Sequence, residues 1–132
     1  MRSTLQRNRR PAIIGSVYLS PLVICSAIAT GRSPLVRRTE IEAALRRLAP
    51  RIRPHELAAV VDHALDSRGL RSASAESAAW LSLIAYARHT FTEYDDLLEQ
   101  GYDRDSARFF VAEDMQAVLT AWGVARRLTL KE

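Results

Sequence analysis

The residues best suited to chemistry lie together in the second half of the chain, in YARHTFTEYDDLLEQGYDRDSARFF, which runs from Tyr86 to Phe110. Within it, His89, Tyr94 and Asp95 could hold and move a proton, because a histidine near a carboxylate is a common general acid–base arrangement. The stretch lacks the HExxH pattern of zinc proteases and the spacing of a calcium-binding loop. It therefore supports an enzyme hypothesis centred on three side chains, and we predict no metal site.

Helix ends give a second explanation for the same residues. The spacings from Thr90 to Glu93 and from Thr92 to Asp95 both match a capping box, in which a threonine begins a helix. The helix dipole favours carboxylates in the first turn of a helix and a histidine such as His89 near the last turn. We therefore favour a structural hinge between three helices over a catalytic corner.

A polar network is predicted around this hinge. Asp114 lies close to an apolar helix stripe, and a buried carboxylate must be paired. We expect Asp114 or Asp95 to pair with Arg88 or His89. The complete set of candidates, for a structural network or an alternative site, is Arg88, His89, Thr92, Tyr94, Asp95, Arg108 and Asp114.

Positive charge concentrates in the other half of the chain. Up to Arg71 there are thirteen arginines against five acids, whereas the remainder has six Lys or Arg against ten acids. These counts give about +8 and −4, and a basic half suits an anionic partner. Eighteen of the nineteen cations are arginines, which bind phosphate in a bidentate geometry. The candidate anion-binding residues are Arg37, Arg38, Arg46, Arg47, Arg51 and Arg53.

Two functions fit this charge distribution. Arg37 and Arg38 precede a helix that we expect to begin at Thr39, so a phosphate could dock on its free backbone N–H groups. We predict a binding module for nucleic acid or a ribonucleoprotein that contacts the backbone, because basic and aromatic residues do not interleave as base stacking requires. The alternative is a scaffold in which the basic half of one copy meets the acidic half of another. We predict no cofactor.

Apolar periodicity predicts an all-α fold, a compact single-domain bundle of five to six helices. We expect these helices to begin near residues 21, 39, 54, 75, 93 and 104. The one containing AAWLSLIAYA is apolar nearly all round and belongs at the centre of the core. Gly69, Gly101 and Gly123 each follow a helix and precede an apolar residue, which predicts three left-handed Schellman ends.

The last predicted helix runs from Arg104 to Ala121, with Asp103 as its N-cap. Its apolar stripe consists of Ala107, Phe110, Val111, Met115, Val118, Leu119 and Trp122. We divide the chain into a basic, partly apolar segment 1–19, a helical domain 20–124 and a basic tail 125–132.

The N-terminal region carries a mixed signal. Four arginines precede a largely apolar run over residues 11–30, as in a secretion signal or membrane anchor. Gly15 and the Ser20-Pro21 helix start interrupt that run, so we predict a cytoplasmic protein without membrane contact, with a signal or anchor as the alternative. Cys25 is the single cysteine, which excludes a disulfide or a cysteine-cluster zinc site within this sequence.

The second half also carries a recognisable residue pattern. It consists of Arg88-His89, Thr92, Tyr94-Asp95, Leu97-Leu98, Gly101, Arg104, Ala107-Arg108, Val111 and Trp122. In these positions the chain resembles a bacterial and fungal family of uncharacterised proteins, domain of unknown function family twenty-two ninety-three. The resemblance covers about the last half of the chain, reaching back toward Arg53, and it implies no activity, cofactor or partner.

Overall fold

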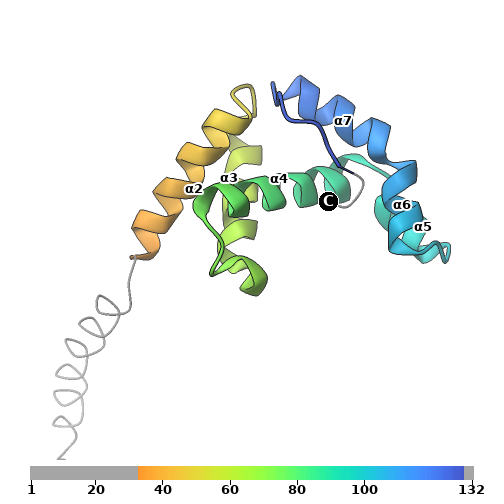
Figure 1. The fold of residues 1–132 in the computed structure, drawn as a ribbon, viewed down its shortest axis with the longest axis horizontal. Coiled ribbons are helices and arrows are strands. Elements are labelled where there is room, and N and C mark those ends of the chain that lie inside the picture. The colour runs from red at the N-terminus through yellow and green to blue at the C-terminus, as the bar shows by residue number, and fades with distance from the viewer. Residues whose placement is uncertain (1–32, 130–132) are drawn as a thin grey trace, which may run out of the picture. The chain divides into compact units, whose positions relative to one another are not determined.

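The computed structural model describes residues 33–129, and within them it is all-helical, as predicted (Figure 1). Its α-helices are α2 (Pro34–Leu48), α3 (Pro54–Asp66), α4 (Ala75–Phe91), α5 (Tyr94–Glu99), α6 (Arg104–Phe110) and α7 (Ala112–Ala121). A short 3-10 helix, η1 (Arg68–Leu70), follows α3. The helical body comprises the residues from Arg37 onward. The predicted helix over 21–30, the segment 1–19, Cys25 and the candidate signal lie outside the described residues.

Helix α4 is the centre of the core, as its sequence predicts. It packs chiefly against α3 and α7, which lie beside it in Figure 1. Its buried side chains are Ala78, Ala79, Trp80, Ser82, Leu83, Ile84, Ala87 and Arg88. Ser74 caps this helix by accepting the backbone N–H of Ser77 at 3.1 Å. Because these side chains pack into the core, they hold α4 in place against α3 and α7.

The start of α2 differs from the prediction. The helix begins at Pro34 and not at Thr39, so Arg37 and Arg38 lie inside it. Ser33 accepts the N–H of Leu35 at 3.4 Å, and the ring of Pro34 fixes a helical backbone angle at the first position. The Ser-Pro start therefore prevails over the Thr39 capping box, and the expected phosphate site on free N–H groups beside Arg37 and Arg38 is absent.

Two of the three predicted glycine-capped ends are present. Gly101 and Gly123 have φ angles of 97° and 84°, and Tyr102 and Val124 donate back to the carbonyls of α5 and α7. Gly69 is different, because α3 already ends at Asp66 and Ser67 is extended. Gly69 instead belongs to η1, so its predicted left-handed conformation is wrong.

The predicted helix from Arg104 to Ala121 is two helices, α6 and α7, separated at Val111. Val111 leaves the helical geometry with a ψ of 3°, although no glycine or proline signals a break there. Asp103 caps α6 as expected, accepting the N–H groups of Asp105 and Ser106 at 3.1 Å. Phe110 is 57 % exposed and does not join the buried stripe, which corrects that prediction.

Candidate functional site

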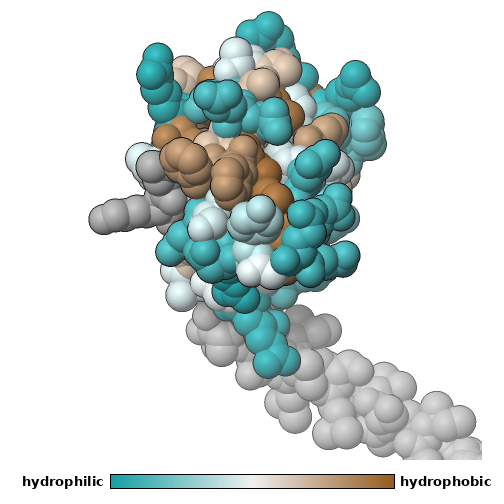
Figure 2. All heavy atoms as spheres, turned by 90° about the vertical axis from the view of Figure 1, so that its right-hand side faces the viewer, coloured by the Kyte–Doolittle hydropathy of each residue, from teal (hydrophilic) through white to brown (hydrophobic). Residues whose placement is uncertain are grey.

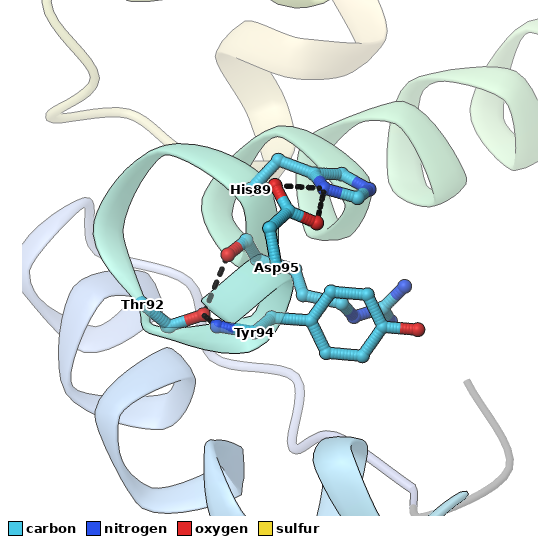
Figure 3. Close-up of polar contacts among 5 residues, drawn as sticks. His89, Thr92, Tyr94 and Asp95 are labelled. Carbon is cyan, nitrogen blue, oxygen red and sulfur yellow. Dashed lines mark hydrogen bonds and ion pairs between the residues drawn. The ribbon is translucent and has the colours of Figure 1, made fainter. Parts of the chain in front are cut away.

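The predicted hinge brings His89 and Asp95 together (Figure 3). The Nδ1 atom of His89, in the last turn of α4, lies 2.8 Å from one carboxylate oxygen of Asp95 in the first turn of α5. The His89 ring meets Tyr94 edge-on, with centroids 5.5 Å apart. Thr92 donates its hydroxyl to the carbonyl of Arg88 and accepts the N–H of Tyr94. These contacts close the turn between α4 and α5, although Thr90 lies inside α4 and caps nothing.

The corner is a solvent-facing pair, because both the His89 and Asp95 side chains are about half exposed. Tyr94 is buried, and Arg88 places its guanidinium 5.2 Å from the centre of the Tyr94 ring. Within residues 33–129, three or more His, Cys, Asp or Glu side chains do not gather where they could hold a metal ion. The arrangement joins the ends of two helices through the His89–Asp95 contact, and Tyr94 is buried in the core.

Asp114 does not belong to this network. It is exposed on α7, which contradicts its predicted burial. Arg88 and Arg108 instead line a separate cavity of about 170 Å³ whose walls include Met115 and Leu128. Burial lowers the pKa of Arg88 below its ordinary value and the nearby charge of Arg108 lowers it further, whereas Tyr94 acts in the opposite direction.

Two of the six candidate anion-binding arginines have structural roles. Arg37 donates to the carbonyls of Leu70 and Ala73 at 2.7 and 3.0 Å, which ties α2 to the turn before α4. Arg38 forms an ion pair with Asp62 of α3 at 2.9 Å and a second one with Glu42, one turn further along α2, at 3.4 Å. Their guanidinium groups therefore satisfy polar groups of this fold, and they are weak candidates for an external anion.

The other four arginines, Arg46, Arg47, Arg51 and Arg53, are exposed. We call them the 46–53 arginine cluster. Arg47 forms a surface ion pair with Glu76 at 3.2 Å. The remaining three make no ion pair with any residue between 33 and 129. Their positive charge is therefore directed to solvent.

Arg51 and Arg53 also border a cavity of about 480 Å³ that the sequence does not reveal. The cavity lies where the connector between α2 and α3 meets the C-terminal ends of α4 and α7. Its other lining residues are Glu56, Phe91, Val118, Ala121 and Trp122. The connector is held there because Arg51 donates its N–H to the carbonyl of Trp122 at 2.9 Å. Basic and aromatic side chains that are far apart in the sequence thus share one cavity, contrary to the sequence-based expectation.

Glu56 forms the most buried polar part of this cavity. It is 5 % exposed, and its Oε2 atom accepts from the indole N–H of Trp122 at 3.1 Å and the backbone N–H of Arg53 at 3.2 Å. Its Oε1 atom accepts no hydrogen bond from the part of the chain that the structure describes. Glu56 therefore fixes the indole in place and leaves one carboxylate oxygen without a donor.

The comparison with protein families matches residues 44–123 to the family described as Uncharacterized conserved protein (DUF2293). The match spans more than half of the chain. The chain belongs to the DUF2293 family. No curated protein and no solved structure matches it significantly. The DUF2293 region includes the 46–53 arginine cluster, the cavity and the His89–Asp95 pair, whereas Arg37 and Arg38 precede it.

Sequence reasoning missed two residues of the cavity in this DUF2293 domain. The sequence patterns assign no binding role to Phe91 or Glu56. The position of Glu56 three residues after Arg53 is a usable signal, because a glutamate there caps a helix. The contact between Glu56 and Trp122 spans 66 residues, and no local pattern signals it.

Proposed function

We propose that this DUF2293 protein binds nucleic acid through the 46–53 arginine cluster, with contacts mainly to the phosphate backbone. The observation that supports this most directly is that Arg46, Arg51 and Arg53 are exposed and make no ion pair with residues 33–129. The segment RRLAPRIR supplies four arginines in eight residues without an acid. Arginine binds phosphate well because its guanidinium is planar and always charged.

The size of the cluster suits a short stretch of one strand. Arg46 and Arg47 lie in the last turn of α2, and Arg51 and Arg53 lie in the connector that follows it. The Cα atoms of Arg46 and Arg53 are therefore closer together than the roughly 25 Å that seven residues of fully extended chain would span. One strand of B-form DNA rises about 3.4 Å per nucleotide, so the cluster spans fewer than about seven nucleotides. Four phosphate contacts on a single strand give a slope of log affinity against log salt near −3, at about −0.7 per contact.

The test is a fluorescence anisotropy titration of the full chain with a labelled 12-nucleotide single strand, over about 50 to 200 mM salt. Changing Arg51→Gln and Arg53→Gln together should flatten the slope by about 1.4 and weaken all sequences. Arg104→Gln is the control, because Arg104 is also exposed but lies at the start of α6, in the acidic half of the chain. Absence of binding at about 50 mM salt, or an unchanged slope in the double variant, contradicts the proposal.

A second candidate function, a protein-interaction module that self-associates, is favoured by exposed aromatic residues. Phe109 and Phe110 of α6 are 64 % and 57 % exposed, and Tyr102 packs edge-on against Phe110. Figure 2 shows apolar side chains gathered on the side of the molecule where α5, α6 and α7 lie, with hydrophilic residues around them. Light scattering after size exclusion tests this: a dimer that Phe109→Ser dissociates supports it, and a monomeric wild type refutes it.

The structure itself offers one observation on membranes. Among residues 33–129, no helix combines the length and the apolar character needed to cross a bilayer.

A further inference from the structure

The cavity beside Arg51 and Arg53 has the chemistry of a base-binding site. At about 480 Å³ it falls within the usual size range of ligand pockets. Arginines border it, and the rings of Phe91 and Trp122 line it. Nonspecific single-strand proteins combine these two elements, with cations along the backbone and aromatic rings under the bases.

We propose that this cavity takes one unpaired base of a single-stranded nucleic acid, with the base stacked on Phe91 and its amino group donating to Glu56. This inference rests on the proposed function and adds the strand type and base preference. The bound strand has its phosphates on Arg51 and Arg53, so the base beside them turns toward the ring. A duplex keeps its bases paired and stacked, and cannot place one in the cavity without opening.

Phe91 is suited to stacking because it is apolar, exposed and rigidly held. It is 43 % exposed, in the last turn of α4, where His89 and Thr90 are exposed as well. Trp122 and Tyr86 meet it at interplanar angles of 82° and 72°, with ring centroids 5.6 and 6.1 Å away. Neither neighbour is stacked parallel on Phe91. Two aromatic contacts thus fix the ring in advance, which reduces the entropy lost when a base binds.

Glu56 selects which base is favoured. Its Oε2 atom is occupied by the donors of Trp122 and Arg53, so Oε1 is the oxygen left for a ligand. A carboxylate accepts from the amino group of cytosine or adenine, whereas thymine and uracil present a carbonyl oxygen in the same position. The negative charge also repels a phosphate, so the base and not the backbone enters the cavity. We expect adenine and cytosine strands to bind more tightly than thymine strands.

The experiment is an anisotropy series on the full chain with labelled dA12, dC12, dT12, a 12-base-pair duplex and rA12, each over a range of salt. Phe91→Ala should weaken dA12 and dC12 binding about 5- to 150-fold, the range expected for loss of one base–aromatic stack. The salt slope should not change, because the phosphate contacts remain. Phe91→Trp should retain the affinity. Leu81→Ala should match the wild type, because Leu81 is an exposed apolar residue of α4 that does not line this cavity.

Two further comparisons separate the possible failures. If Phe91→Ala lowers the melting temperature, Phe91→Leu preserves apolar packing while removing the aromatic face, and it should show the same loss of affinity. Glu56→Gln should reduce the preference for dC12 over dT12, because an amide both donates and accepts. Salt-dependent binding that is equal for dA12, dT12 and duplex, and unchanged in Phe91→Leu, overturns the base site alone. Absence of binding to every probe at about 50 mM salt overturns the proposed function as well. Comparing rA12 with dA12 shows which kind of strand is preferred.

Discussion

Replacing Glu56 with alanine should destabilise the protein strongly, although glutamate is ordinarily a surface residue. The change leaves the buried indole N–H of Trp122 and the partly buried N–H of Arg53 without their acceptor. A buried donor without a partner costs about 1–3 kcal/mol, and the Arg53 N–H, which can reach water more easily, costs less. We therefore expect a loss of about 2–4 kcal/mol in the free energy of unfolding. For a domain of this size that lowers the melting temperature by about 8 °C or more.

Urea denaturation followed by circular dichroism measures this loss. Glu76→Ala is the matched control, because the Glu76 side chain is 76 % exposed and only pairs with Arg47 at the surface. The control should change stability by no more than about 0.5 kcal/mol. Glu56→Gln should fall between the two, since its amide oxygen can still accept from the indole. A loss below about 0.5 kcal/mol for Glu56→Ala refutes the role of this carboxylate in holding Trp122.

Three further changes test other parts of the structure. Gly123→Ala should lower the free energy of unfolding by about 1 kcal/mol or more, because φ is 84° and an added Cβ comes within 3.1 Å of Pro50. Gly69→Ala is the control and should be nearly neutral, because an added Cβ there meets nothing within 4 Å. Equal melting temperatures for the two variants would refute this. Asp114→Ala should leave the thermal melt unchanged, because Asp114 is exposed on α7, and a clear decrease would restore its predicted place in a network. Hydrogen bonds from Ser106, above all from its hydroxyl and then from its backbone N–H, lower the pKa of Asp103. The ionised carboxylate therefore stabilises the fold at pH values above the ordinary pKa of aspartate, about 3.9. That contribution is lost as the pH falls through the lowered value, so wild type should lose more stability on acidification than Asp103→Asn; parallel pH curves contradict it.

Local patterns were sufficient for most of the helices and for their order. The apolar face of α4, the Asp103 cap of α6 and the glycines after α5 and α7 act within one or two helical turns. Such signals depend on backbone hydrogen bonds and side chains only a few residues apart, so they can be recognised in a linear sequence. The contact between His89 and Asp95 belongs to this group, because only six residues separate the pair.

Competition between local signals was harder to resolve. We predicted a helix start at Thr39, but α2 begins earlier, at Pro34. The break at Val111 carries no glycine or proline, and α3 ends before the glycine that was expected to end it. These helix ends could not be ranked from the sequence, because the differences in local helix propensity that separate the alternatives are small.

The cavity and the state of each arginine were decided by the tertiary structure alone. Arg37 and Arg53 look equivalent in the sequence. In the structure, however, Arg37 donates hydrogen bonds to backbone carbonyls of the turn before α4, whereas Arg53 remains exposed. Likewise Phe91 and Trp122 meet because the ends of α4 and α7 pack together. Residue types and short-range spacing determine which helices form and how much charge the chain carries. Which polar groups find partners, and which aromatic rings stay exposed beside a cation, depends on contacts between residues far apart in the chain, since burial is a property of the packed fold.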